Sequence, residues 1–140
     1  MINQYKEKLN ENGLKNTPQR LAILDIIANE KQPLSAEEIL SKLNISVNLS
    51  TIYRTLDTMA QKNIISKLEI DGVDRCVYEY NREGHRHYLI CKGCKKIVAI
   101  YGCPLATYEK SLEQKTEYKI DEHKLFIYGY CPDCNRNKQN

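Results

Sequence analysis

The chain reads Tyr88-Leu89-Ile90-Cys91-Lys92-Gly93-Cys94 early in its second half, and it repeats the two-cysteine spacing at Cys131-Pro132-Asp133-Cys134. Two thiolates separated by two residues can bind one small cation within a short turn. Two such turns supply the four sulfurs of a closed tetrahedral zinc site. Each pair follows an apolar run, so each is predicted to end a strand. We therefore predict a structural zinc bound by Cys91, Cys94, Cys131 and Cys134.

Bulk properties exclude several classes of protein. The 140 residues contain no apolar run near the length of a membrane span, and the first residues are polar, without a signal-peptide core. We therefore expect a cytoplasmic protein, in which paired cysteines favour metal binding over disulfides. Residues 1–80 carry ten basic and eleven acidic side chains, and residues 81–140 carry eleven and seven. This balance alone does not indicate a nucleic-acid partner.

The first half is predicted to form three short helices and a hairpin. Asn16-Thr17-Pro18, Ser35-Ala36-Glu37-Glu38 and Asn48-Leu49-Ser50 each combine a capping side chain with a following apolar pattern of helical spacing. Alternating apolar runs at 64–70 and 76–80 flank an Asp-Gly turn, which is typical of a β-hairpin. This order of elements predicts a winged helix-turn-helix domain at residues 1–80.

The second half is predicted to form a small α/β domain. Residues 81–84 are a polar, glycine-containing break and the best candidate for a hinge. Beyond it we expect a strand ending at Cys91, a strand at 96–101, a helix at 104–116, a strand at 124–129 and a polar tail. The chain is therefore predicted to be an α+β protein, with a small α/β domain at residues 85–140.

A helix at about residues 49–59 is the candidate for DNA recognition. In a helix-turn-helix, residues near the start of the second helix reach base edges. Ser50, Thr51, Tyr53 and Arg54 offer hydroxyl and guanidinium groups there. The alternative is a solvated polar face with Tyr53 half-buried, and the pattern alone favours neither interpretation.

Four motifs resemble those of the ferric uptake regulator (Fur) family, over roughly residues 10–134. They are Gly13-Leu14-Lys15-Asn16-Thr17-Pro18-Gln19-Arg20, Ser50-Thr51-Ile52-Tyr53-Arg54-Thr55-Leu56, His85-Arg86-His87-Tyr88-Leu89-Ile90-Cys91, and His123-Lys124-Leu125-Phe126-Ile127-Tyr128 with the second cysteine pair. The resemblance implies a homodimeric, metal-dependent transcriptional repressor. It also implies an N-terminal winged helix that binds an inverted-repeat operator, and it implies that the α/β domain at residues 85–140 is the metal-binding dimerisation domain. In that family pattern Tyr53 and Arg54 contact DNA, and Arg20 contacts its backbone or minor groove.

A sensor needs a second metal site, because a closed four-sulfur site is expected to keep its zinc. Candidate ligands are the remaining histidines and cysteines and one glutamate: His85, His87, His123, Cys103, Cys76 and Glu79. His85 and His87 lie two apart on a predicted strand and so project from one face. Cys103 precedes a predicted helix, whose dipole favours a thiolate. The alternatives are exposed surface histidines, a small buried Cys76 in the hairpin strand and a solvent-facing Glu79.

The chain departs from the family pattern at this sensor. Many members have a hinge histidine where this chain has Gln32-Pro33, and histidines where it has Arg86 and Tyr88. A glutamate that many members use in an additional site would fall near Ala106, with Glu109 one helical turn later. Either the sensor has moved to the His85, His87 and His123 cluster, or a local shift near Gly84 restores the usual geometry.

Ligand chemistry selects the predicted metal. Sulfur beside imidazole suits zinc, whereas iron or manganese sites are richer in carboxylates. Cys76 and the turn at Cys103 resemble the zinc uptake regulator (Zur) branch. We therefore predict a zinc-responsive repressor of zinc uptake genes, with one structural and one regulatory zinc, operator DNA as partner, no membrane partner and no small-molecule substrate. Alternatives are an iron-responsive repressor, with ferrous iron in the second site, and a zinc-ribbon module that binds protein. A thiol-disulfide enzyme is disfavoured, because paired cysteines on zinc leave no exposed reactive thiol.

Overall fold

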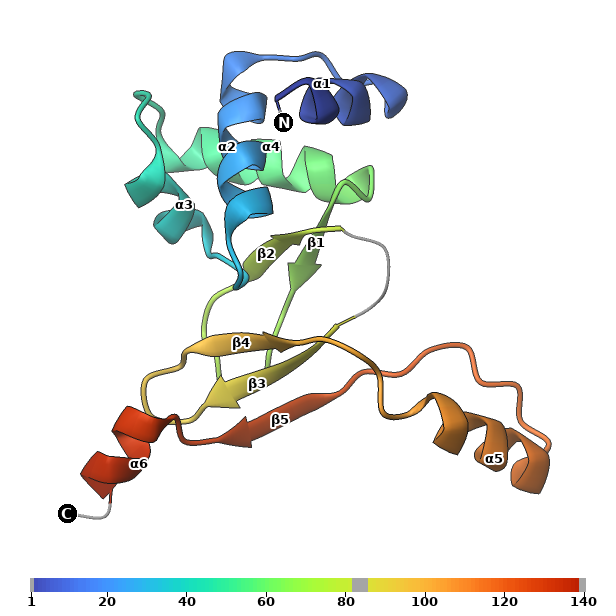
Figure 1. Ribbon diagram of the computed structural model, residues 1–140. Coiled ribbons are helices and arrows are strands. Elements are labelled where there is room, and N and C mark those ends of the chain that lie inside the picture. Colours follow the sequence, from blue (N-terminus) through green and yellow to red (C-terminus); the bar gives the residue numbers. More distant parts are fainter. Residues whose placement is uncertain (1, 82–85, 139–140) are drawn as a thin grey trace. The chain divides into compact units, whose positions relative to one another are not determined.

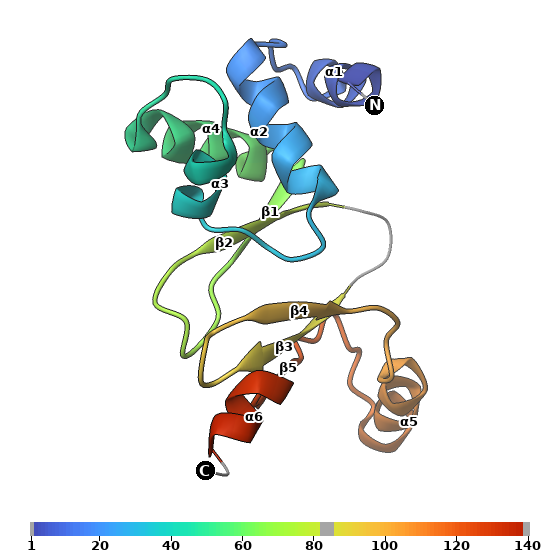
Figure 2. The same cartoon turned by 60° about the vertical axis from the view of Figure 1, so that its left-hand side comes forward.

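The computed structural model describes residues 2–81 and 86–138, which divide into two compact units, Met1–Asn81 and Arg82–Asn140. Figures 1 and 2 show the helices and strands of each unit. The predicted hinge at 81–84 falls almost entirely outside the described residues, so it stays a prediction. Among the described residues, no helix has the length and apolar character that crossing a membrane requires.

Four helices form most of the N-terminal unit: α1 (Ile2–Glu11), α2 (Pro18–Asn29), α3 (Ala36–Lys42) and α4 (Leu49–Gln61). The predicted caps of the last three are confirmed. Thr17 accepts a hydrogen bond from the Arg20 backbone, Asn48 accepts one from Thr51, and Ser35 and Glu38 form a reciprocal capping box. These bonds satisfy backbone donors that a helix start otherwise leaves unpaired, so the local sequence determines where each helix begins.

Helix α1 was not predicted from the sequence. Its residues are mostly polar, and within residues 3–11 the buried side chains are Tyr5 and Leu9, one helical turn apart. Such a narrow apolar stripe is a weak sequence signal. The helix is stabilised by packing its two apolar side chains into the core of the unit.

The core of this unit buries one face of each helix against the hairpin. Helix α4 contributes Ile52, Leu56 and Met59, which are fully buried and recur at helical spacing. They pack with α2 residues such as Ile23 and with Tyr78 of the hairpin. Because this face of α4 is anchored in the core, the opposite face is presented to solvent in a fixed orientation.

The hairpin consists of β1 (Ile65–Leu68) and β2 (Val77–Tyr80), paired antiparallel with Ile65 opposite Tyr80. The predicted Asp71-Gly72 turn is present, and Gly72 adopts a φ of +82°, a conformation that glycine tolerates without strain. The strands are shorter than predicted, however. Cys76 lies at the end of the connecting loop, directly before β2, and the prediction that placed it in the strand was wrong.

The C-terminal unit contains a three-stranded sheet and two helices (Figure 1). The sheet comprises β3 (His87–Cys91), β4 (Ile97–Ile100) and β5 (Phe126–Gly129), in the order β4-β3-β5. Strand β4 pairs antiparallel with β3, whereas β5 pairs parallel with it. Helix α5 (Ala106–Thr116) lies in the connection from β4 to β5, which crosses from one edge of the sheet to the other. Residues 132–138 form a helix, α6 (Pro132–Lys138), where the sequence analysis expected a polar tail after the second cysteine pair.

One face of β3 carries His87 at its start, Leu89 in the middle and Cys91 at its end, because side chains alternate along a strand. His87 and Cys91 are buried, whereas Leu89 is 40% exposed. Its register partners Val98 and Ile127 are 41% and 45% exposed. The sheet therefore places an exposed apolar row, formed by Leu89, Val98 and Ile127, between two buried polar positions.

Candidate metal centres and nucleic-acid interface

The four predicted zinc ligands converge at one end of the sheet. The sulfurs of Cys91, Cys94, Cys131 and Cys134 all lie within 4.8 Å of one another. Cys91 is the last residue of β3, Cys131 follows β5, and Cys134 lies in the first turn of α6. None of the six cysteines of the chain forms a disulfide. Two segments that are distant in sequence thus present four sulfurs to one point, as a closed tetrahedral zinc site requires.

The turn at Gly93 leaves room for these sulfurs only because it lacks a side chain. A Cβ at this position would lie 2.8 Å from Sγ of Cys134 and 3.1 Å from its Cβ. Gly93→Ala should therefore overpack the site and lower the stability of the zinc-bound protein by about 1–3 kcal/mol. Thermal unfolding of the zinc-bound protein would measure this loss.

Gly129 at the end of β5 provides a matched control for that substitution, because a Cβ there would meet no atom within 4 Å. Gly129→Ala should leave the free energy of unfolding within about 0.5 kcal/mol of the original. Equal melting temperatures for the two variants would show that the packing at Gly93 is not needed.

Backbone hydrogen bonds favour the ionised form of one sulfur. The backbone N–H groups of Cys94 and Cys131 donate to Sγ of Cys91, at 3.4 and 3.3 Å. These bonds, that from Cys131 first, lower the pKa of the Cys91 thiol to about 6. Conversely, the neighbouring sulfurs of Cys131 and Cys91 raise the pKa of Cys134 to about 12.

Four such sulfurs cannot all be thiolates at neutral pH without a cation to offset their mutual repulsion. A divalent metal meets this requirement, and zinc suits four soft sulfurs with no open position. The residues therefore fit a structural zinc, whose binding when present would contribute to the folding free energy.

A second group of ligands lies at the opposite end of β3. Nε2 of His87 lies 3.4 Å from Sγ of Cys103 and 3.2 Å from Nε2 of His123, and the latter lies 3.3 Å from the same sulfur. The two imidazole rings stack with their centroids 4.9 Å apart. His87 begins β3, Cys103 lies between β4 and α5, and His123 precedes β5. This group of three side chains is called the His-Cys-His cluster below.

The His-Cys-His cluster has the character of a metal site. Two imidazole nitrogens and one sulfur, each with a lone pair when deprotonated, lie less than 4 Å apart. Water has little access to them, since His87 is only 3% exposed. One shared cation can accept the lone pairs of all three atoms at once, whereas hydrogen bonds among the three can pair only some of them. The three ligands that the described residues supply leave a fourth tetrahedral position open, which distinguishes this group from the closed four-sulfur site.

The six predicted regulatory ligands thus have different outcomes. The structure brings His87, Cys103 and His123 together. His85 lies outside the described residues. Cys76 and Glu79 belong to the N-terminal unit, in which the described residues contain no group of three metal-ligating side chains. Roles for His85, Cys76 and Glu79 therefore stay predictions.

Glu109 was not assigned to the site from the sequence, yet its carboxylate contacts the His-Cys-His cluster. It extends from the first turn of α5 and forms an ion pair with Nδ1 of His123. The sequence analysis noted only that Glu109 lies one helical turn beyond a position where relatives carry a glutamate. That spacing was the available signal in the sequence. It could not be used without knowing where α5 begins, because the start of the helix determines which side chains of its first turn reach His123.

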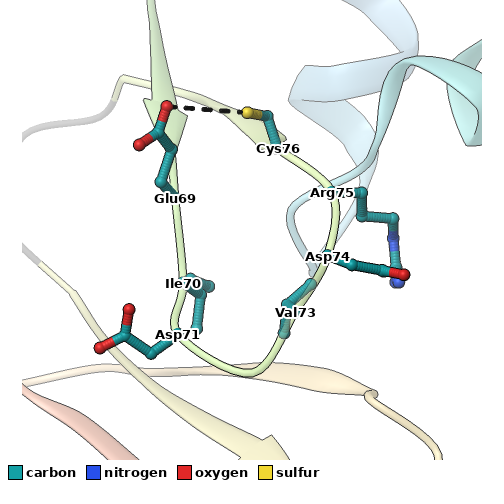
Figure 3. A pocket seen from close by; sticks show the side chains of 7 residues that line it. All are labelled: Glu69, Ile70, Asp71, Val73, Asp74, Arg75 and Cys76. Carbon is teal, nitrogen blue, oxygen red and sulfur yellow. Dashed lines mark hydrogen bonds between the residues drawn. The ribbon is translucent and has the colours of Figure 1, made fainter.

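The hairpin loop around Cys76 encloses a small hollow of about 280 Å³ (Figure 3). Sγ of Cys76 lies 3.9 Å from a carboxylate oxygen of Glu69 across the base of the loop. Arg75 points away from the hollow and pairs with Glu38 at 3.4 Å. The loop is therefore tied both across its own base and to α3.

The exposed face of α4 carries the predicted DNA-binding side chains. Ser50 and Arg54 are exposed, Thr51 is half-buried, and Tyr53 is 38% exposed, which both interpretations of this face allow. The Tyr53 hydroxyl donates to Glu37 at 2.9 Å, and this bond raises the pKa of Tyr53. Arg54 donates to the Thr51 hydroxyl at 3.3 Å. Each group is thus a hydrogen-bond donor held near the start of the helix.

Arg20 lies on a different helix, α2. It is half-buried, and its guanidinium donates to the carbonyl oxygen of Lys15 at 3.1 Å. This bond orders the arginine near the start of α2, and its remaining donors stay available to an anion. The position suits a phosphate contact of the kind implied by the resemblance.

Comparisons with known proteins identify the family of the chain. The family model described as "Ferric uptake regulator family" matches residues 11–128. A protein named "Ferric uptake regulation protein" from Synechococcus elongatus is 36% identical over 138 residues, which cover 94% of this chain and 93% of that protein. Its namesake from Bacillus subtilis is 32% identical over 142 residues, covering 96% and 94%.

A solved structure supports the same assignment. The Helicobacter pylori ferric uptake regulator, described as having three functional metal-binding sites, superposes with a TM-score of 0.81 at 25% identity, covering 96% of this chain and 94% of that one. Members of this family are metal-dependent transcription regulators and not enzymes. On the match over residues 11–128, the shared fold and the four-sulfur site, this chain belongs to the ferric uptake regulator family.

Proposed function

We propose that the protein is a zinc-responsive transcriptional repressor that binds palindromic operator DNA as a homodimer and controls zinc uptake genes. The observation that carries the choice of metal is the His-Cys-His cluster, in which a thiol sulfur lies 3.3–3.4 Å from two imidazole nitrogens. One sulfur with two imidazoles favours zinc, whereas ferrous or manganous sensors use more oxygen ligands.

The two metal sites have separate tasks in this proposal. The four-sulfur site is closed and buries Cys91, so it suits a permanently bound zinc. The His-Cys-His cluster has fewer protein ligands and a less thiolate-rich donor set, so it suits a metal that exchanges with the cell. When bound there, zinc would supply a bridge between the segments that carry His87, Cys103 and His123.

The protein itself supplies the coupling from that bridge to DNA. His87 holds the start of β3, Cys103 the segment after β4, and His123 the segment before β5. Fixing these three segments favours one arrangement of the C-terminal unit over the many that are accessible when they are free. Only the fraction of dimers in a competent arrangement binds the operator, so occupancy of the cluster sets the apparent affinity.

Support for the DNA-bound state comes from α4. Its exposed face offers Tyr53 and Arg54 as donors, while Ile52, Leu56 and Met59 anchor the opposite face in the core. Arginine can bind guanine through two hydrogen bonds, and the tyrosine ring can pack on a thymine methyl group. A rigid helix with these side chains suits recognition in the major groove.

Support for a homodimer comes from the sheet of the C-terminal unit. Leu89, Val98 and Ile127 form an exposed apolar row across its three strands, and β5 is an edge strand among the described residues. An apolar row and an unpaired edge are features that proteins cover by association. A twofold dimer would present two copies of α4, as a palindromic operator requires.

The proposal is tested by titrating zinc into protein stripped at the regulatory site, in the presence of a labelled AT-rich palindromic duplex. Fluorescence anisotropy should show operator binding that rises with zinc at constant protein concentration. A parallel titration with ferrous iron under anaerobic conditions is the comparison. Operator binding that ignores zinc and responds to iron alone would overturn the zinc assignment.

Substitution of the cluster sulfur should shift that zinc titration. Cys103→Ser removes a soft ligand, and a lost ligand should cost at least as much affinity as a lost outer partner, about 10–100-fold. The zinc concentration at half-maximal operator binding should rise accordingly, with the structural zinc retained. Cys76→Ser is the comparison for the loss of a thiol, and an equal shift in that variant would support the predicted ligand role of Cys76. Equal titration midpoints for the Cys103→Ser and original proteins would contradict a ligand role for Cys103.

An iron-responsive repressor is the second candidate. It is favoured by the names of the relatives from Synechococcus elongatus and Bacillus subtilis, both "Ferric uptake regulation protein". The same anisotropy titrations separate the two candidates. Each titration gives the free metal concentration at which operator binding is half-maximal. Iron would be favoured if that concentration lies within the cell's range for free iron, while the value for zinc lies above the cell's range for free zinc.

A further inference from the structure

The carboxylate of Glu109 lies behind His123, on the side of the ring away from the other cluster ligands. Nε2 of His123 lies 3.3 Å from Sγ of Cys103 and 3.2 Å from Nε2 of His87. Nδ1 of the same ring forms the ion pair with Oε1 of Glu109. The imidazole is therefore held between the cluster on one edge and a carboxylate on the other.

Oε1 of Glu109 is buried, and within residues 2–81 and 86–138 no group other than Nδ1 of His123 is placed to donate a hydrogen bond to it. A buried carboxylate oxygen without a donor costs free energy. The polar group that faces it is Nδ1 of His123, so a proton on that nitrogen removes the cost. This proton leaves the lone pair of His123 on Nε2, directed at Cys103 and His87.

Glu109 is not itself part of the converging ligand set. The ligand atoms that lie within 4.8 Å of one another belong to His87, Cys103 and His123 alone among the described residues. A carboxylate in this outer position fixes the tautomer and the orientation of the imidazole that binds the metal. Glu109 therefore acts on the cluster through His123.

Glu109 also connects the cluster to α5. No side chain of α5 is buried, and Tyr108, beside Glu109, is 58% exposed. Helices in proteins gain most of their stability from packing an apolar face, and α5 buries no such face against the other described residues. The ion pair with His123 is thus a specific attachment of the first turn of α5 to the metal-binding segment.

We propose that Glu109 is a positioning residue, which holds His123 in the metal-binding tautomer and docks the first turn of α5 when the cluster binds zinc. The inference rests on the proposed role of the His-Cys-His cluster as the regulatory metal site. Metal occupancy would then be transmitted to a helix that makes few contacts of its own.

Two substitutions separate hydrogen bonding from simple loss of the side chain. Glu109→Gln keeps an oxygen that accepts a hydrogen bond from Nδ1, whereas Glu109→Ala removes the acceptor. Glu113→Ala is the matched control, because Glu113 is a second carboxylate of α5 whose hydrogen bond goes to the backbone of Ile120. Full-length protein with its structural zinc is used throughout, and zinc content with circular dichroism verifies the fold of each variant.

Zinc affinity of the cluster, measured by competition with a chelator, should fall about 10–100-fold in Glu109→Ala. It should fall less in Glu109→Gln and stay unchanged in Glu113→Ala. Proton–nitrogen NMR of the histidine rings should show the Nδ1-protonated tautomer of His123 in the original protein and a mixture in Glu109→Ala. Zinc should increase amide-exchange protection at residues 106–110, and this increase should be lost in Glu109→Ala even at saturating zinc.

The outcomes distinguish the inference from the proposed function. If the original protein binds no second zinc, the regulatory cluster and the role of Glu109 both fall. If it binds a second zinc but Glu109→Ala has the original affinity, tautomer and protection, only the role of Glu109 falls. Cobalt spectra that change coordination number in Glu109→Ala would make Glu109 a direct ligand and would also overturn the inference.

Discussion

The Cys91→Ser variant is expected to lose its tightly bound zinc and, with it, the folded C-terminal unit. Sγ of Cys91 lies at the end of β3 and accepts hydrogen bonds from the backbones of Cys94 and Cys131. Structural zinc contributes about 10–16 kcal/mol in small zinc domains at neutral pH, which is comparable to the total stability of about 5–15 kcal/mol of an ordinary domain. Metal analysis should therefore find less than one zinc per chain, and amide exchange should show residues 86–138 unprotected.

Cys76→Ser is the control for the loss of a thiol as such. Cys76 lies in the hairpin loop of the N-terminal unit, beside Glu69, and its replacement should leave zinc content and melting temperature unchanged. The N-terminal unit has its own core, so its amides should stay protected in Cys91→Ser. A Cys91→Ser protein that keeps one zinc per chain and the original melting temperature would contradict the structural role.

The double variant Tyr53→Ala with Arg54→Ala is expected to lose operator binding while it keeps its fold, its zinc and its oligomeric state. Both side chains lie on the exposed face of α4, so their removal leaves no cavity in the core. Specific base contacts contribute about 1–3 kcal/mol each, so the pair should cost about 2–6 kcal/mol, or roughly 30- to 20,000-fold in affinity. Anisotropy with zinc-loaded protein and a palindromic duplex measures the loss.

The matched control for that variant is Gln61→Ala, at the far end of the same helix and also exposed. It should bind the operator with nearly the original affinity, since the start of the recognition helix is the part that enters the groove. Near-original binding by the double variant would remove α4 from the interface. That result would favour the remaining alternative, a zinc-ribbon module that binds protein.

Much of the N-terminal fold could be predicted because its signals are local. Thr17-Pro18, the Ser35–Glu38 box and Asn48 each place a capping group next to an apolar stripe, and all three helices begin where those groups predict. Helices α1 and α6 lack such signals. Helix α1 is stabilised mainly by burying Tyr5 and Leu9, and α6 begins within the second cysteine pair, so both depend on tertiary structure.

The two metal sites also differ in how far local sequence patterns predict their ligands. The four-sulfur site is encoded by two local spacings, so the sequence identifies all its ligands. The His-Cys-His cluster joins three segments, and only the parallel pairing of β3 with β5 brings His87 and His123 together. From the sequence, Cys103 and Cys76 had equal claims to a ligand role. Glu109 had only its spacing from the glutamate position of relatives, because the crossover that turns α5 toward His123 leaves no local pattern.

The parallel pair of β3 and β5 has a metal-ligating group at each of its ends. His87 begins β3 and His123 precedes β5, whereas Cys91 ends β3 and Cys131 follows β5. In an otherwise free chain, joining His87 to His123 would close a loop of about 36 residues, at an entropic cost on the order of 3 kcal/mol. Once zinc joins Cys91 to Cys131, that loop is already closed. The zinc of the four-sulfur site thereby lowers the entropic cost of ordering the regulatory site. Removing that zinc should therefore reduce the affinity of the regulatory site for its metal by a similar free energy, although none of the regulatory ligands is changed.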